Sequence, residues 1–142
     1  MIKRKFPDKA KSASILKNAE GNMDVIESIK NNQKAGSLIV STIYECFRML
    51  GDALLTAEGF ETTGKDHHKE MISRLLKINV KTTRPLLVLD ELRRKRNDIN
   101  YEGYTPTEDE IKDTLAIKDA LWKPMLTEVK RLIEGTGSIT SD

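Results

Sequence analysis

The residues of this chain with the clearest chemical potential are arginines and polar side chains spaced along one predicted helix in its second half. In a helix, Arg96 shares a face with apolar residues, because Leu89 and Leu92 fall about 20° and 40° from it around the axis. A guanidinium on such a face costs free energy unless an anion or a hydrogen-bonding group meets it. Asn100 lies one turn further along the same edge, and Tyr101 follows it. The sequence therefore predicts an arginine-centred polar cluster in a helix-lined groove.

Arg96 is the last residue of a basic run that begins at Arg93. A solvated helix face explains Arg94 and Lys95, which point away from the apolar side of the helix, but it does not explain Arg96. Two interpretations of Arg96 stay open. In one, it holds a carboxylate of another helix in a buried ion pair. In the other, it binds a phosphate or the RNA backbone, because a guanidinium matches phosphate with two hydrogen bonds.

The segment 59–66 resembles a phosphate-binding loop in the spacing of its glycines and lysine. Such a loop needs a Ser or Thr hydroxyl for magnesium directly after the lysine, and a β-strand before it. Here Asp66 follows Lys65, and the preceding segment is predicted to be helical. Because an aspartate would repel a triphosphate, we interpret the segment as a connection between two helices, with Asp66 favourably placed near the start of the second.

The chain has two histidines, His67 and His68, which are adjacent. On a helix, neighbouring side chains point about 100° apart, so these imidazoles are poorly placed to bind one ion together. Three interpretations of His68 stay open: a metal ligand, a residue at the edge of the core, or a groove residue near Arg96 that helps with proton transfer. Cys46 lies on an apolar helical stripe and is predicted to be a small buried side chain. We expect no metal and no cofactor.

Length and composition favour a single helical domain. The 142 residues suffice for one domain with a core, and 32% of them are charged while only 8 are glycine and 4 are proline. The net charge of +2 does not indicate the strongly basic surface that coats nucleic acid in bulk. A single cysteine excludes an internal disulfide framework. No apolar run reaches the roughly 18 residues that cross a bilayer, so we expect no membrane association and a cytoplasmic location.

Apolar residues at helical spacing predict five helices. Pro85 suits the first turn of the fourth helix, and Thr107 with Glu110 forms a capping box at the start of the fifth. Gly21 is expected to weaken the first helix, and Pro124 is expected to kink the fifth. The predicted helices span 8–30, 34–58, 65–80, 85–101 and 107–133.

No segment shows the alternating apolar pattern of a β-strand. We therefore expect an all-α protein, an up-and-down bundle of four to five helices. Residues 8–134 would form the single domain, between a flexible N-terminal tail at 1–7 and a flexible C-terminal tail at 135–142.

The order of these helices and their motif residues resemble the HEPN superfamily of small α-helical proteins. The resemblance covers most of the chain, from residue 10 to residue 133. It depends on a tyrosine-bearing second helix that is followed by a Leu-Leu pair and a glycine, on a histidine-containing third helix, and on the signature helix at 92–101. The second-helix pattern is carried by Tyr44, Leu54, Leu55 and Gly59.

Many HEPN members are metal-independent ribonucleases, often toxins paired with a nucleotidyltransferase-type antitoxin, and members typically dimerise so that two motifs meet in one cleft. The family motif is an arginine, usually followed by a polar residue, with a histidine further along the helix. The resemblance places the motif arginine at Arg96 and the polar residue at Asn97. The histidine position falls on Tyr101, or on Asn100 in a register one residue shorter. The resemblance implies a homodimer, with RNA and such an antitoxin as partners.

This chain departs from the motif at the group that moves protons. Metal-free RNA cleavage needs one group to take the 2′-hydroxyl proton and another to protonate the leaving oxygen. A tyrosine has an ordinary pKa near 10, and an amide does not titrate usefully, so neither replaces an imidazole as a base at pH 7. The motif thus keeps its phosphate anchor and lacks its usual proton shuttle.

Two functions stay open. The first is an HEPN-like RNA-binding protein with weak or vestigial metal-independent endoribonuclease activity, as part of a toxin–antitoxin or defence system. The alternative is a catalytically inactive HEPN-like interaction or dimerisation module that binds a protein partner or a small anionic ligand. In the first, Arg96 holds the scissile phosphate and Tyr101 is the surrogate acid. The candidate catalytic residues are Arg96, Asn97, Asn100 and Tyr101, the candidate RNA contacts are Arg93, Arg94 and Lys95, and the accessory candidates are His68 and Tyr44.

Overall fold

The computed structural model, which describes residues 2–136, is arranged around one apolar helix, α2 (Gly36–Glu58). The buried residues of α2 include adjacent pairs such as Ile43 and Tyr44. Adjacent side chains point about 100° apart on a helix, so α2 must be covered on several sides. The elements that precede or follow it are α1 (Lys9–Ile29), the 3₁₀ turn η1 (Gln33–Ala35), α3 (His67–Leu76), α4 (Val88–Glu102) and α5 (Glu108–Gly135).

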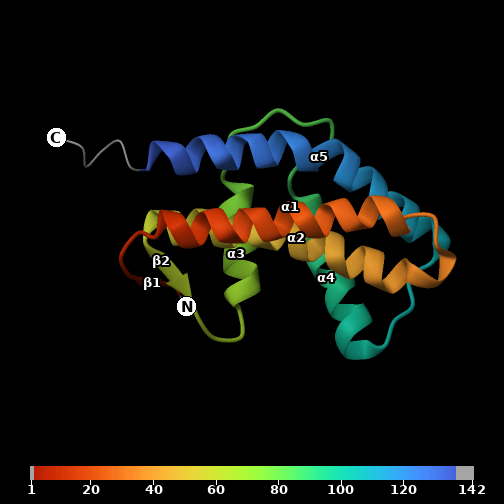
Figure 1. Cartoon of the computed structure of the whole chain (residues 1–142). Coiled ribbons are helices and arrows are strands. Elements are labelled where there is room, and N and C mark those ends of the chain that lie inside the picture. Colours follow the sequence, from red (N-terminus) through yellow and green to blue (C-terminus); the bar gives the residue numbers. More distant parts are fainter. Residues whose placement is uncertain (1, 137–142) are drawn as a thin grey trace.

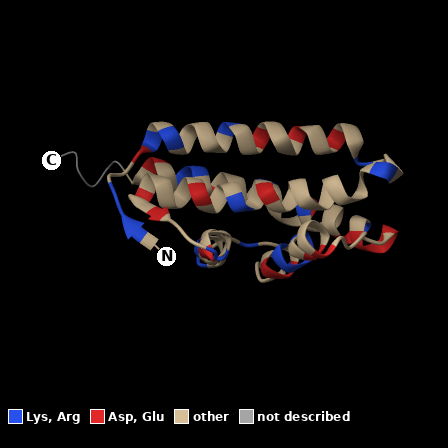
Figure 2. Ribbon diagram, turned by 90° about the horizontal axis from the view of Figure 1, so that it is seen from below, with Lys and Arg blue, Asp and Glu red and all other residues tan. Residues whose placement is uncertain are grey.

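The other helices cover α2 in two ways. α1 and α5 run along α2, whereas α3 and α4 are shorter and run across it (Figure 1). Seen from below, α2 lies between α1 on one side and α3 and α4 on the other (Figure 2). The prediction of an all-α helical bundle is confirmed.

Two short strands lie at one end of the bundle, and no pattern in the sequence predicts either of them. β1 (Ile2–Arg4) pairs antiparallel with β2 (Phe60–Thr62), which follows α2. The backbone of Lys5 also donates to the carbonyl oxygen of Gly59 at 2.8 Å, so the chain before α1 is tied to the end of α2. The expectation of a flexible tail at 1–7 is therefore corrected for β1. Three-residue strands are too short to leave an alternating apolar pattern in the sequence.

Two predicted weak points leave their helices unbroken. Gly21 lies within α1, where a Cβ would meet no atom within 4 Å, and the buried apolar face of α1 offsets its low helix propensity. α5 continues through Pro124, and Figure 1 shows that its axis changes direction along its length, as the predicted kink requires. α4 begins at Val88 rather than at Pro85, because the backbone N–H of Val88 closes a turn onto the carbonyl of Pro85 at 3.3 Å.

The capping box of α5 is confirmed. The backbone N–H of Glu110 donates to Thr107 Oγ1 at 3.2 Å, and that of Thr107 donates to Glu110 Oε1 at 2.9 Å. At its other end α5 extends to Gly135. Of the C-terminal tail expected at 135–142, residues 137–142 lie outside the described part of the chain.

α3 lies very close to α2 because Gly51 has no side chain. A Cβ on Gly51 would lie 2.2 Å from the carbonyl oxygen of Met71 in α3, far inside van der Waals contact. Ile72 and Leu75 then bury the apolar face of α3. The backbone contact at Gly51 therefore sets where the first turn of α3, with its histidines, lies relative to α2.

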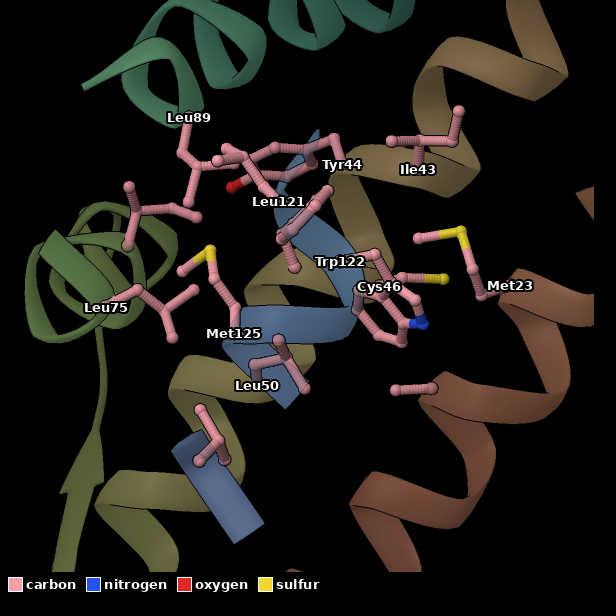
Figure 3. Close-up of a cluster of buried hydrophobic side chains, with 14 of the residues drawn as sticks. Met23, Ile43, Tyr44, Cys46, Leu50, Leu75, Leu89, Leu121, Trp122 and Met125 are labelled. Atoms are coloured by element: carbon pink, nitrogen blue, oxygen red, sulfur yellow. The ribbon is translucent and has the colours of Figure 1, made fainter. Parts of the chain in front are cut away.

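Aromatic and aliphatic side chains of four helices fill the space around α2. Phe47 meets Trp122 edge to face, with ring centroids 5.3 Å apart. Cys46 is buried as predicted, and burial raises the pKa of its thiol to about 12. No helix in the described residues is long and apolar enough to span a membrane. Figure 3 shows the converging side chains, among them Met23, Leu75, Leu89, Leu121, Trp122 and Met125.

Candidate functional site

Arg96 lies inside the protein rather than on its surface. It is only 4% exposed and shares the inner side of α4 with Leu89 and Leu92, which are also buried. The prediction that this guanidinium is drawn inward is therefore confirmed. The side chains that meet it come from α2, α3 and α4, namely Tyr44, Glu45, His68 and Tyr101.

Two residues of α2 face the guanidinium. Arg96 Nη2 lies 3.5 Å from Glu45 Oε1, at the long end of hydrogen-bond range. Glu45 also accepts a hydrogen bond from Nε of Arg48 at 2.9 Å, so one carboxylate serves two arginines. The ring of Tyr44 lies against Arg96, whose Cζ is 4.8 Å from the ring centroid, within the range of a cation–π contact. The three charged side chains together carry a net positive charge.

His68 of α3 contacts Arg96 directly, through Nδ1 and the Nη2 group of the arginine. A guanidinium has only donors, so His68 Nδ1 accepts, and the proton of the neutral imidazole lies on Nε2. Burial, together with the positive charges of Arg48 and Arg96, lowers the pKa of His68 to about 4. His68 is therefore neutral at pH 7. Of the three interpretations of His68 that the sequence left open, the position beside Arg96 is the one that the structure shows.

Two buried polar atoms of this cluster, Arg96 Nε and Tyr44 Oη, have no hydrogen-bond partner among the described residues. Burial raises the pKa of Tyr44, so its hydroxyl keeps its proton at pH 7. Leaving a buried donor unpaired costs about 1–3 kcal/mol, and native proteins contain few such groups. The cluster thus has hydrogen-bonding capacity that its own side chains do not use.

Arg74 provides a comparison within the same chain, because its guanidinium is fully paired with one carboxylate. It donates from Nε and Nη2 to the two carboxylate oxygens of Glu58, at 2.8 and 2.7 Å. This bidentate pair joins α3 to the end of α2 and leaves Nε satisfied. Arg96 has no such pair, because its nearest carboxylate lies 3.5 Å away and is shared.

A cavity of about 120 Å³ opens onto Arg96 between α3 and α4. Lys65, Lys69 and Arg93 line it together with Arg96, and Asp66 is the one acidic residue among its described lining residues. Pockets for drug-sized ligands are roughly 300–1,000 Å³. The cavity therefore suits a small anion, such as one phosphate group, better than a whole nucleotide.

The structure brings only some of the predicted site residues to this cavity. Asn97 and Tyr101 line it, and Arg96 Nη1 lies 3.5 Å from Tyr101 Oη. Asn100 does not, because its side-chain oxygen accepts a hydrogen bond from Ser41 Oγ of α2 at 3.4 Å. Although Asn100 lies one turn from Arg96, its side chain contacts α2 and not the cavity.

The basic run divides in the same way. Arg93 lines the cavity and pairs with Asp90 at 3.0 Å. Arg94 is exposed and pairs with the same Asp90 at 3.3 Å, while Lys95 lies 3.6 Å from Glu110. Arg94 and Lys95 are therefore not among the residues around the cavity.

Five charged residues around Arg96 and its cavity are not among the predicted site residues: Glu45, Arg48, Lys65, Asp66 and Lys69. Glu45 and Arg48 stand one turn apart beside the apolar stripe of α2, a signal of a charged pair at the edge of the core. Lys69 gave no signal that distinguishes it from other surface lysines, and Lys65 belongs to the segment 59–66, which we interpret from the sequence only as a connection between two helices. Only the crossing of α3 and α4 over α2 brings these residues to Arg96 (Figure 1).

A larger groove of about 580 Å³ lies between α1 and α5. Its buried Lys118 contacts Glu27 of α1 and, at 3.2 Å, Asp119. The hydrogen bond from Lys118 lowers the pKa of Glu27 to about 2. The buried charge of this groove is thus already compensated by its own residues, unlike that of Arg96.

In the part of the chain that the structure describes, no group of three or more histidine, cysteine, aspartate and glutamate side chains could hold a metal ion. Comparisons with protein-family models, curated proteins and solved structures find no match for this chain. The geometry around Arg96 is therefore the feature of the chain that bears on its function.

Proposed function

We propose that the protein binds RNA by a backbone phosphate in the Arg96 cavity, and that it cleaves the RNA slowly without a metal ion. The observation that carries the proposal is a buried guanidinium without a close carboxylate of its own, on the wall of a phosphate-sized cavity lined by cations. Guanidinium groups bind phosphate with paired, charge-assisted hydrogen bonds. A phosphate in the cavity would lie against the guanidinium of Arg96, and its charge would be further balanced by Lys65 and Lys69.

The proposal keeps the resemblance to the HEPN superfamily, with Arg96 as the motif arginine and Asn97 as its polar neighbour. The position of the motif histidine is occupied by Tyr101, but His68 of α3 supplies an imidazole in contact with the same arginine. The titratable group would then come from a different helix. A homodimer in which two cavities meet, and a nucleotidyltransferase-type partner in a toxin–antitoxin or defence system, belong to the same proposal.

The cleavage chemistry follows from the groups at hand. The 2′-hydroxyl loses its proton and attacks the phosphorus, and the 5′ oxygen leaves and takes up a proton, which gives a 2′,3′-cyclic phosphate and a 5′-hydroxyl. His68 is neutral at pH 7, and its Nδ1 would accept the first proton once the bound phosphate replaces it as the partner of Arg96 Nη2. Tyr101 Oη is the candidate donor of the second proton. A bound phosphate would raise the pKa of His68 from about 4 toward its ordinary value. A base with so low a pKa is weak, so we expect slow turnover.

A cleavage assay in EDTA tests the proposal. Wild-type protein incubated with transfer RNA or total RNA should release fragments with 2′,3′-cyclic phosphate ends, and Arg96→Ala should not. Arg131→Ala is the matched control, because it removes the same charge from an exposed ion pair with Glu128 on α5. His68→Ala should lose cleavage but keep RNA binding. Fragments that Arg96→Ala produces equally well would contradict the proposal.

A second function, that of a catalytically inactive interaction module, is favoured by one specific observation. The contacts of Arg96 with Glu45 and His68 join α4 to α2 and α3, so the same cluster is suited to hold a surface in shape. Under this alternative, Arg96→Ala would change the oligomeric mass or partner binding, and no RNA would bind. Sedimentation of wild-type protein and Arg96→Ala, run beside the RNA assay, separates the two functions.

A further inference from the structure

Tyr101 lies in an uncommon environment for a tyrosine. The residue is 73% exposed, although it belongs to α4 and contacts the buried Arg96. Its ring lies 5.9 Å from Arg96 Cζ, and it lines the mouth of the same cavity. An aromatic ring that is this exposed and lies outside the core has surface available to a ligand that reaches the cavity.

The opposite wall of the cavity also carries aromatic rings. His67 and His68 of α3 stack in parallel, with ring centroids 4.3 Å apart, and His67 is only half-buried. Aromatic rings of both α3 and α4 thus line the cavity. Each nucleobase has such a surface, and base–aromatic stacking is tolerant of base identity.

Positive charges, like the aromatic rings, lie at the cavity on both the α3 side and the α4 side. Lys65 and Lys69 are exposed on the α3 side and have no carboxylate within 4.0 Å in the described part of the chain. Arg93 adds a third cation from α4, partly neutralised by Asp90. Phosphates on either side of the one held by Arg96 would find these cations, as in grooves that track a single strand.

The size of the cavity decides where the base must go. About 120 Å³ holds a phosphate group but not the attached ribose and base, which must lie at the mouth. In a duplex the bases are paired and stacked inside the helix, so their faces do not reach a protein ring beside the backbone. A single-stranded segment can splay a base outward.

We propose that Tyr101 is a base-stacking platform that makes the site specific for single-stranded RNA. The inference rests on the proposed function, because it names the form of RNA that the Arg96 cavity takes. It assigns the ring of Tyr101 to recognition, separately from any role of its hydroxyl in proton transfer.

Fluorescence anisotropy with a labelled single-stranded RNA and its duplex tests this inference. Tyr101→Ala should weaken single-strand binding by about 5- to 150-fold, the range that loss of one stacked base gives. Tyr101→Phe, which retains the ring, should recover most of that loss. Tyr104→Ala is the matched control, because Tyr104 is a second exposed tyrosine near the end of α4 that does not line the cavity. Thermal melting of each variant verifies that it is folded.

The outcomes distinguish this inference from the proposed function. If Arg96→Ala loses RNA binding but Tyr101→Ala binds as wild type does, or if the duplex binds as tightly as the single strand, the stacking role is wrong and the phosphate site stands. If wild-type protein binds no RNA at low salt, both are wrong. A DNA strand of the same sequence tests whether the protein recognises ribose. If DNA and RNA bind with equal affinity, the assignment to RNA is wrong.

Discussion

At the scale of single residues, Arg96 combines two properties that rarely occur together. It is desolvated, which is costly for a charge, yet its partners are a shared carboxylate, a neutral imidazole and an aromatic face. Each of these partners compensates part of the cost, and Nε is left without one. Buried charges that the fold compensates only in part are candidates for binding sites, because an anionic ligand would compensate the rest of the charge.

Truncation of Arg96 should lower the stability of the fold as well as RNA binding. Arg96→Ala removes the partner of His68 and Glu45 and leaves their polar atoms facing an empty space. We expect a loss of about 2–3 kcal/mol in the free energy of unfolding, measured by urea denaturation. Arg131→Ala, which breaks an exposed pair with Glu128, should lose no more than about 1 kcal/mol. An unfolding curve of Arg96→Ala equal to that of wild type would show that Arg96 does not hold these helices together.

The pKa of His68 makes a prediction about acid stability. In the folded protein it is lowered from 6.5 to about 4, so between these values the unfolded state binds the additional proton. Stability therefore falls as pH falls through this window, and the contribution is fully present only above it. His68→Asn, which cannot titrate, should lose less stability than wild type between pH 7 and pH 4. The groups facing His68 are Arg48, Arg96, Glu45 and His67.

Urea denaturation at several pH values checks this prediction. NMR of the imidazole signals provides a direct control, since His68 should titrate well below the ordinary range. Parallel losses of stability in wild type and His68→Asn would mean that burial does not hold this imidazole neutral.

At the scale of elements, the site depends on the way α3 is seated against α2. Gly51 allows the backbone of α3 to approach α2 at Met71, and one turn earlier α3 presents His68 to Arg96. α4 crosses α2 beside α3, so Arg96 of α4 also reaches Glu45 of α2. The site is therefore a junction of three helices rather than the property of one.

Adding a methyl group at Gly51 tests this seating. In Gly51→Ala the Cβ would lie 2.2 Å from the carbonyl oxygen of Met71, so α3 must move away from α2. We expect a loss of about 1–3 kcal/mol in the free energy of unfolding and shifted NMR signals of His68. Gly21→Ala is the matched control, because a Cβ there meets nothing, and it should stabilise by about 0.5–1 kcal/mol. Gly51→Ala as stable as wild type would contradict this view of the seating.

The elements also show what could be predicted from the sequence. Helices with long apolar stripes, such as α2 and α5, were predictable because helical periodicity reflects burial of one face. The inward position of Arg96 was predictable for the same reason, since its neighbours on the helix are leucines. β1 and β2 were not, because a backbone pairing of three residues leaves no periodic signal.

The partners of Arg96 could not be predicted from spacing. Glu45 and His68 are distant in the sequence, and they meet Arg96 only because of the angles at which α3 and α4 cross α2. The prediction for Asn100 shows the same limit, since a residue one turn from Arg96 pairs with Ser41 of α2 instead. Two residues on the same edge of one helix can therefore have different partners on the neighbouring helices, and the sequence does not show which.

At the scale of the whole molecule, charge is mixed rather than gathered on one face. Blue and red segments are interspersed along the helices in Figure 2, consistent with a net charge of +2. RNA binding would therefore come from the local cations of the cavity and not from long-range attraction to the whole surface. Because so few cations take part, we expect RNA to bind with modest affinity and only at the cavity.

The most direct test of the central claim is the affinity for single-stranded RNA over a series of salt concentrations, in wild type, Arg96→Ala and Arg131→Ala. The four cations of the cavity predict that the logarithm of the binding constant falls with that of salt with a slope of about −3. Arg96→Ala should bind at least about tenfold more weakly, with a slope shallower by about 0.7, while Arg131→Ala matches wild type. Absence of binding at low salt, or equal curves for Arg96→Ala and wild type, would contradict the account.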